Sequence, residues 1–83
     1  MRQVLYFSAK WCTHCAATTP LIEQVKRGNP SNVMLVDVDY DAALTSQYNV
    51  RSVPTTVILE NGEEIKRHVG GLSSESLNKL ING

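Results

Sequence analysis

The sequence predicts an α/β domain: a mixed four-stranded sheet with helices packed on it, in the order strand, helix, strand, helix, strand, strand, helix. Two short apolar runs, at 4–7 and 33–38, flank a segment of helical periodicity. This pattern indicates two parallel strands joined by a helical crossover. Asn61-Gly62 lies between two later strand-like runs and is the strongest hairpin signal in the chain. Together these patterns predict a single domain over residues 1–83.

The first half of the chain is expected to hold a buried strand at 4–7 and a long helix from Thr13. The predicted apolar face of this helix consists of Ala17, Leu21, Ile22 and Val25. Gly28-Asn29-Pro30 should end the helix, with a residue that tolerates the left-handed conformation followed by a helix breaker. Pro20 lies inside the helix, where it removes one backbone hydrogen bond and should kink the axis.

In the second half of the chain, the sequence predicts one capped helix before a hairpin and another after it. Asp41 should cap a short helix that ends near Asn49. The hairpin strands are expected at 56–59 and 63–69, joined by a type I′ turn and followed by Gly70-Gly71. Ser73 should cap the final helix. The apolar face of that helix is predicted to be Leu77, Leu80 and Ile81.

Composition excludes several classes of protein. Leu, Ile, Val and Phe make up 22 of 83 residues, which favours an ordered domain. Eight basic residues balance eight acidic ones, so no excess positive charge is present to bind nucleic acid. The apolar stretches are too short to span a membrane, and residues 1–7 do not form a secretory signal. We therefore expect a cytoplasmic protein without membrane contact.

The two cysteines, Cys12 and Cys15, mark the predicted site. A bridge across so short a loop constrains the unfolded chain little, so a redox or metal-binding role is favoured over a structural one. The pair lies where a strand exit becomes a helix, and the unpaired N–H groups at a helix start favour a thiolate. We expect Cys12 to face solvent as the attacking thiolate and Cys15 to be shielded one turn further on.

Two other interpretations of the cysteine pair compete with redox chemistry. Half of a zinc site could be completed by His14 and His68, but His14 lies between the cysteines and no second Cys-x-x-Cys exists. We therefore expect no metal. A binding module with incidental cysteines is the alternative from a different class, and it predicts that Cys12→Ser leaves function intact.

The chain resembles the thioredoxin family over essentially its whole length. The residues that carry the resemblance are Trp11-Cys12-x-x-Cys15, Pro20, the run 36–39 (Val-Asp-Val-Asp), Val53-Pro54-Thr55, Asn61-Gly62 and Val69-Gly70-Gly71. The resemblance implies a thioredoxin-like fold and a thiol–disulfide oxidoreductase whose nucleophile is Cys12 and whose resolving cysteine is Cys15. It also implies a cis Val53–Pro54 bond beside the pair and no cofactor other than the dithiol.

The resemblance further implies a groove for an extended segment of a disulfide-containing protein substrate. Residues expected along it are Trp11, Thr13, Val53, Pro54 and Gly70, although Trp11 could instead shield the cysteine pair. The expected protein is a monomeric electron-transport reductant, recharged by a flavoenzyme of the thioredoxin reductase type. A glutaredoxin-type protein recharged by glutathione is the alternative, because few residues precede the first strand, as in the core that glutaredoxins share.

Two further departures from the family concern the chemistry of the pair. The family's buried aspartate, which helps to deprotonate the resolving cysteine, falls on Tyr6, and its partner lysine falls on Leu35. The group that accepts the proton of Cys15 is therefore expected to differ from the one in the family, and the candidates are water, His14 and Asp37.

Thr13-His14 stands where thioredoxins usually have Gly-Pro. A partly charged His14 would stabilise the thiolate and raise the reduction potential above that of thioredoxin, at about −270 mV, but below that of DsbA, at about −120 mV. The alternative is that His14 only points to solvent. Lys10 would steer acidic partners or add to thiolate stabilisation; the alternative is that it is simply solvated.

Overall fold

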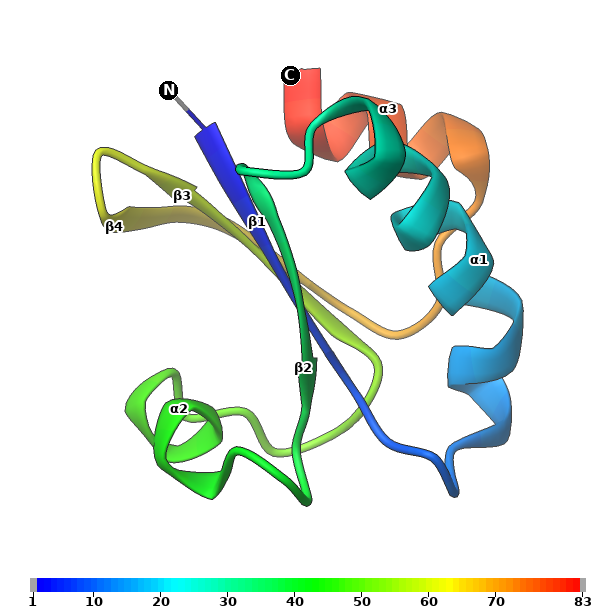
Figure 1. Ribbon diagram of the computed structural model, residues 1–83, viewed down its shortest axis with the longest axis vertical. Helices are drawn as coiled ribbons and strands as arrows, with labels where there is room; N and C mark the ends of the chain where they lie inside the picture. The colour runs from blue at the N-terminus through cyan, green and yellow to red at the C-terminus, as the bar shows by residue number, and fades with distance from the viewer. Residues whose placement is uncertain (1, 83) are drawn as a thin grey trace.

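A computed structural model describes residues 2–82 (Figure 1). Its elements are β1 (Arg2–Ser8), α1 (Thr13–Gly28), β2 (Val33–Asp37), α2 (Ala42–Gln47), β3 (Thr55–Glu60), β4 (Glu63–Val69) and α3 (Ser74–Asn82). The sheet order is β2-β1-β3-β4, with β1 parallel to β2 and antiparallel to β3, and β3 antiparallel to β4. The predicted element order and mixed sheet are confirmed.

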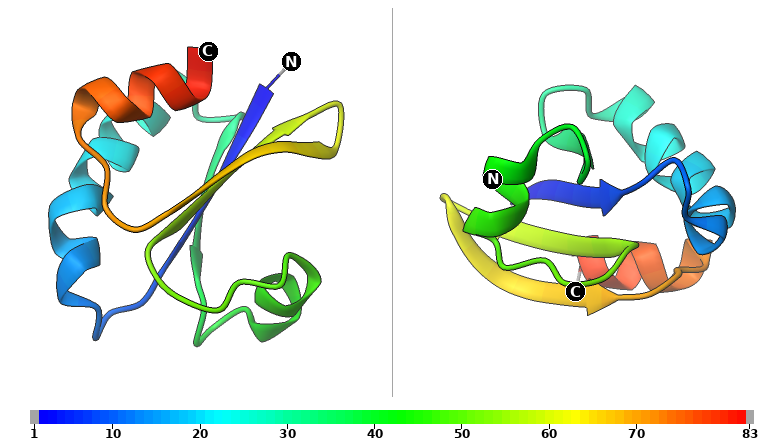
Figure 2. Two further views of the ribbon diagram at one scale, coloured as in Figure 1. Left: turned by 180° about the vertical axis from the view of Figure 1, so that it is seen from behind. Right: turned by 90° about the horizontal axis from the view of Figure 1, so that it is seen from below.

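Helices cover both faces of the sheet (Figures 1 and 2). The helices α1 and α3 lie on one face, and the short α2 lies on the other. Side chains of β1 alternate between the two resulting cores. Tyr6 packs with Ile22 of α1 and Leu77 of α3, whereas Phe7 packs in a second cluster with Val57. The first of these cores holds α1, and therefore the cysteine pair at its start, on the sheet.

The local capping and turn signals are confirmed. The Asp41 carboxylate accepts a hydrogen bond from the Leu44 N–H at 3.0 Å, and the Ser73 hydroxyl accepts one from the Ser76 N–H at 3.1 Å. Asn61 and Gly62 both have positive φ, at 53° and 86°, as a type I′ turn requires. These local interactions set where α2, α3 and the hairpin begin.

Two details of α1 differ from the sequence prediction. The helix ends without a left-handed residue: Asn29 has a φ of −142° and its N–H bonds to the carbonyls of Val25 and Lys26. Ala17 is exposed, and Thr18 is buried instead. The reason is a hydrogen bond that sequence periodicity does not reveal, from the Leu72 N–H to the Thr18 hydroxyl at 3.2 Å.

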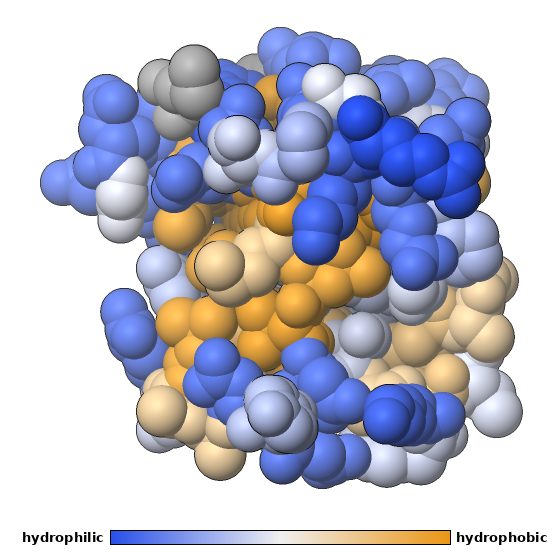
Figure 3. Space-filling view, viewed as in Figure 1, coloured by the Kyte–Doolittle hydropathy of each residue, from blue (hydrophilic) through white to orange (hydrophobic). Residues whose placement is uncertain are grey.

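The edge of the sheet that β2 forms is apolar. In Figure 3, hydrophobic residues gather in the middle of the face shown, where β2 runs. Met34 on β2 is 52% exposed. Across residues 2–82, no helix has the length and apolar character needed to cross a membrane.

Candidate functional site

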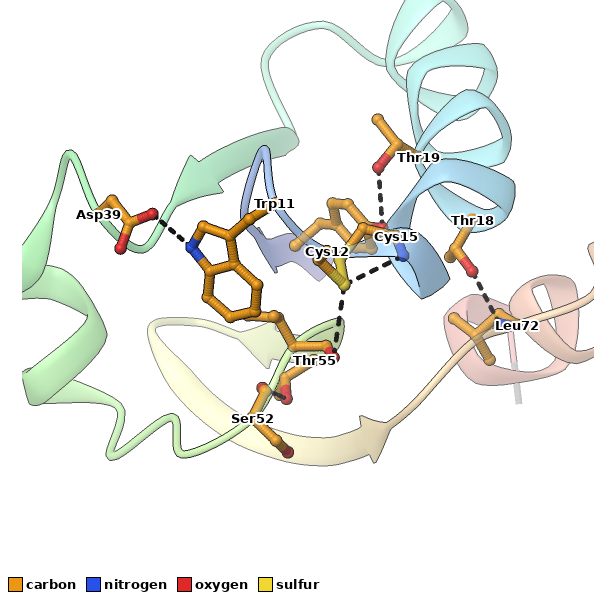
Figure 4. The surroundings of a disulfide bond; sticks show 11 residues. Trp11, Cys12, Cys15, Thr18, Thr19, Asp39, Ser52, Thr55 and Leu72 are labelled. Carbon is orange, nitrogen blue, oxygen red and sulfur yellow. Dashed lines mark hydrogen bonds between the residues drawn. A yellow bond between two sulfur atoms is a disulfide. The ribbon is translucent and has the colours of Figure 1, made fainter.

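The cysteine pair lies at the start of α1, as predicted. Cys12 is the N-cap residue of the helix, and Cys12 and Cys15 form a disulfide with their Cα atoms 5.3 Å apart. The Cys15 N–H donates to the Cys12 sulfur at 3.2 Å (Figure 4). The sulfur therefore occupies the place that a serine or aspartate oxygen takes at other helix starts. A backbone donor and the positive end of the helix both act on this atom.

Cys15 is shielded as predicted, but the prediction that Cys12 faces solvent is wrong. Cys12 is 9% exposed and Cys15 is 3% exposed, so Cys12 is the more accessible of the two but does not stand free in solvent. The cover comes from Ala9 and Val53, which pack around the pair. The Cys12 sulfur lies 3.7 Å from the Val53 carbonyl oxygen. Val53 therefore covers the Cys12 sulfur on one side.

The loop before β3 supplies this cover. The Val53–Pro54 peptide bond is cis, which confirms the prediction. The Pro54 side chain is fully buried, and its carbonyl accepts a hydrogen bond from the Gly70 N–H at 2.8 Å. The Thr55 hydroxyl donates to the Ser52 carbonyl at 2.7 Å and ties the loop from the other side. Pro54 therefore lies beneath the loop, whereas Val53 is only half-buried.

Gly70 occupies a conformation that suits glycine. Its φ is +106°, a region that residues with a Cβ rarely adopt. Because its N–H binds Pro54, the chain leaving β4 is held directly against the cis-proline loop. The sequence prediction placed Gly70 beside the groove, and the structure brings it to the same loop as Val53.

Trp11 lies on the surface beside the pair, with 68% of the residue exposed. Its indole N–H donates to a carboxylate oxygen of Asp39 at 2.7 Å (Figure 4). Sequence reasoning assigned no role to Asp39. The strand order could have revealed this contact. Asp39 follows β2, which is parallel to β1, so the residues that leave the two strands lie at the same end of the sheet.

Tyr6 is completely buried beneath α1, at the position where the family has an aspartate. Its hydroxyl lies 3.0 Å from the hydroxyl of Thr19. Burial raises the pKa of Tyr6 above its ordinary value, and the hydrogen bond with Thr19 offsets part of this effect. The phenol is therefore neutral at physiological pH and supplies no ionised oxygen near the cysteines.

An open hollow of about 350 Å³ reaches the cysteine pair from the side of β1 and β2. Its lining includes Lys10, Cys12, Cys15, Thr19 and Asp37. Lys10, expected beside the pair, is therefore placed there, with an exposed side chain. Asp37 is half-buried, and one of its carboxylate oxygens accepts a hydrogen bond from the Asp39 N–H at 2.9 Å.

The two residues between the cysteines are exposed. Neither Thr13 nor His14 forms a side-chain hydrogen bond with another residue of the described range 2–82. His68 lies on β4, where its ring nitrogen contacts the Gly71 carbonyl at 3.1 Å. Within residues 2–82, no three His, Cys, Asp or Glu side chains gather into a set that would hold a metal ion.

A helix-capping dithiol beside a cis-proline loop defines a centre for thiol–disulfide exchange. The thioredoxin family model matches residues 1–83. Thioredoxin H5 of Oryza sativa subsp. japonica is 45% identical over 69 residues, which is 82% of this chain and 51% of that protein. Thioredoxin of Bacillus subtilis is 32% identical over 78 residues, covering 92% of this chain and 75% of its own length.

A solved structure agrees with these sequences. A mutant thioredoxin from Halobacterium salinarum superposes with a TM-score of 0.86 and 35% identity, covering 96% of this chain and 71% of that one. The chain thus spans about half of the rice protein and about three quarters of the bacterial one. It belongs to the thioredoxin family, and its Cys12–Cys15 pair is the redox centre of a thiol–disulfide oxidoreductase.

Proposed function

We propose that this protein reduces disulfide bonds in other proteins, with Cys12 as the attacking cysteine and Cys15 as the resolving one. The observation that carries the assignment is the N-cap position of Cys12, whose sulfur accepts the Cys15 N–H at 3.2 Å. A thiolate is stabilised by that donor and by the helix start, so Cys12 is the better nucleophile at neutral pH. Cys15 lies one turn further into the helix.

The proposed reaction has two exchange steps. The Cys12 thiolate attacks one sulfur of the substrate disulfide, and the other substrate sulfur leaves as a thiolate, which gives a mixed disulfide. The Cys15 sulfur then attacks Cys12, and the second substrate sulfur departs with its electron pair. The substrate gains two electrons and the protein is left with the Cys12–Cys15 bridge that the structure contains.

The substrate segment is proposed to lie across Val53. Val53 is half-buried, covers the Cys12 sulfur, and forms the part of the cis-proline loop whose backbone faces the pair. Exposed side chains beside it, Trp11 and Thr13, form one wall of the proposed groove, and Gly70 borders the other. The Asp39 carboxylate orients the Trp11 ring, which favours a role for Trp11 in the groove over one as a cover.

The proposed recharging partner is a flavoenzyme of the thioredoxin reductase type. The support is that the relatives matched along most of the chain are thioredoxins from plants and bacteria. We propose that residues 1–83 act as one monomeric domain, as a cytoplasmic electron carrier without a further cofactor. Glutathione is the competing source of electrons.

Coupled assays distinguish the two sources of electrons. With insulin as the disulfide substrate, we expect NADPH consumption when thioredoxin reductase is supplied, and little when glutathione and glutathione reductase replace it. Cys12→Ser is the control that removes the nucleophile in both assays. Faster turnover with glutathione would contradict the proposed partner and identify a glutaredoxin-type protein.

His14 favours a second candidate function, a more oxidising disulfide-exchange protein, because it is exposed between the two cysteines. An imidazolium there would stabilise the reduced form, and one unit in the thiolate pKa corresponds to about 30 mV. His14→Pro is therefore expected to lower the reduction potential by about 30 mV or more in a redox titration. His68→Gln, which removes the histidine on β4, is the matched control. Equal potentials for His14→Pro and the parent protein would rule out this tuning role.

A further inference from the structure

The hollow beside the cysteine pair contains a carboxylate that the proposed mechanism has not used. Asp37 is the last residue of β2 and pairs in parallel register with Ser8 of β1. Alternation along the strand places Asp37 on the same face as Val33 and Leu35, which is the face that α1 covers. Asp37 and Cys15 consequently line the same open hollow.

The lining of this hollow contains no carboxylate or imidazole besides Asp37. His14, the other side chain expected to handle this proton, is exposed and does not line the hollow. The Tyr6 phenol is neutral and its hydroxyl is engaged with Thr19. Lys10 carries a positive charge and has no free acceptor. Leu35, two residues before Asp37 and on the same face of β2, is apolar. Among the residues that line the hollow, Asp37 alone carries a carboxylate.

We propose that Asp37, reached through water in the hollow, accepts the proton of the Cys15 thiol during the second exchange step. This inference rests on the proposed function, because it concerns the cysteine assigned there as the resolving one. The family's aspartate corresponds to Tyr6 on β1, and the proposal assigns its role to a carboxylate on the neighbouring strand β2. A hollow of about 350 Å³ that opens to solvent has room for bridging water molecules.

The step balances in protons and electrons. In the mixed disulfide, the Cys15 proton passes through water to the Asp37 carboxylate as the Cys15 sulfur bonds to the Cys12 sulfur. The bond between Cys12 and the substrate sulfur breaks, and the substrate leaves as a thiolate with the electron pair. Asp37 then returns its proton to solvent or to the departing thiolate. No further oxidant or reductant is needed.

Charged and polar groups from three segments surround Asp37. Lys10 from the loop before α1 lines the same hollow, as do Cys12 and Cys15. From the β2–α2 loop, the Asp39 N–H binds its carboxylate and the Asp41 N–H binds its carbonyl. Because the Asp39 contact uses one carboxylate oxygen, an asparagine amide oxygen can replace it. Asp37→Asn therefore removes the proton acceptor while retaining the turn.

The test separates the two exchange steps in one experiment. The reduced protein is mixed in a stopped-flow instrument with an aromatic disulfide that releases coloured thionitrobenzoate. Attack by Cys12 releases the first equivalent, and attack by Cys15 on the mixed disulfide releases the second. For Asp37→Asn we expect an unchanged first phase and a second phase slowed roughly 10-fold or more at neutral pH.

Glu23→Gln is the charge-matched control, since Glu23 is exposed on α1 and lies outside the hollow. It should leave both phases unchanged. A second phase of Asp37→Asn with the same rate as that of the parent, or a higher one, would overturn the role of Asp37 alone. A parent protein that shows no fast first phase would overturn the proposed function as well. Thermal unfolding of both variants checks that the fold is retained.

Discussion

Replacing Cys12 by serine is expected to abolish insulin reduction, leaving only the rate of dithiothreitol alone. The serine hydroxyl can still cap α1, so the fold should be retained, but no thiolate remains to attack a disulfide. Cys15→Ser is expected to fail differently. Cys12 still attacks, but the mixed disulfide persists because the resolving sulfur is missing.

Mass spectrometry of the two variants distinguishes these failures. After incubation with a disulfide-containing protein, Cys15→Ser should carry a covalent adduct on Cys12 that a reductant releases, whereas Cys12→Ser should not accumulate one. Substrate proteins captured on Cys15→Ser would also identify the physiological partners. If Cys12→Ser retained the full activity of the parent, the cysteines would be incidental and a non-catalytic binding module would be the better interpretation.

Replacing Ile22 by alanine is expected to have the largest effect on stability. Ile22 is completely buried between α1 and the sheet, in the cluster that includes Tyr6, Ile58 and Leu77. Truncating a buried isoleucine costs about 2–5 kcal/mol through lost transfer free energy and the cavity left behind. A domain of 83 residues has a total stability of about 4–12 kcal/mol, so the loss is a large fraction of it.

Denaturant unfolding followed by circular dichroism measures this loss. Gln24→Ala is the matched control on the same helix, because Gln24 is exposed and its truncation should change stability little. The helix carrying Ile22 also carries the cysteine pair, so disulfide reduction by Ile22→Ala should fall at temperatures where the parent is still folded. A midpoint for Ile22→Ala equal to that of the parent would show that α1 is held to the sheet by other contacts.

The elements that local chemistry determines were predictable from the sequence. Asp41 and Ser73 cap the helices expected of them, and Asn61-Gly62 forms the expected turn, because each of these signals acts within a few residues. The position of Cys12 at a helix start was also predictable, since a strand-like run and a helical pattern meet there. The cis Val53–Pro54 bond came from the family resemblance rather than from local chemistry.

The interactions that the sequence did not reveal join distant segments. Trp11 and Asp39 are separated by 28 residues and meet because β1 and β2 are parallel neighbours. Thr18 is buried because its hydroxyl receives the N–H of Leu72, 54 residues away. The shielding of Cys12 likewise comes from Val53 across the site. Periodicity and spacing along one chain do not contain these contacts, which depend on how the strands are ordered in the sheet.

The pH dependence of alkylation at Cys12 tests most directly whether its sulfur is activated by the start of α1. The reduced protein is treated with iodoacetamide over a range of pH, and mass spectrometry of the digested chain follows each cysteine separately. A sulfur stabilised by the Cys15 N–H and the helix start should react with a midpoint well below about 8.5, the ordinary pKa of a cysteine. A midpoint at or above that value, or faster reaction at Cys15 than at Cys12, would contradict this account.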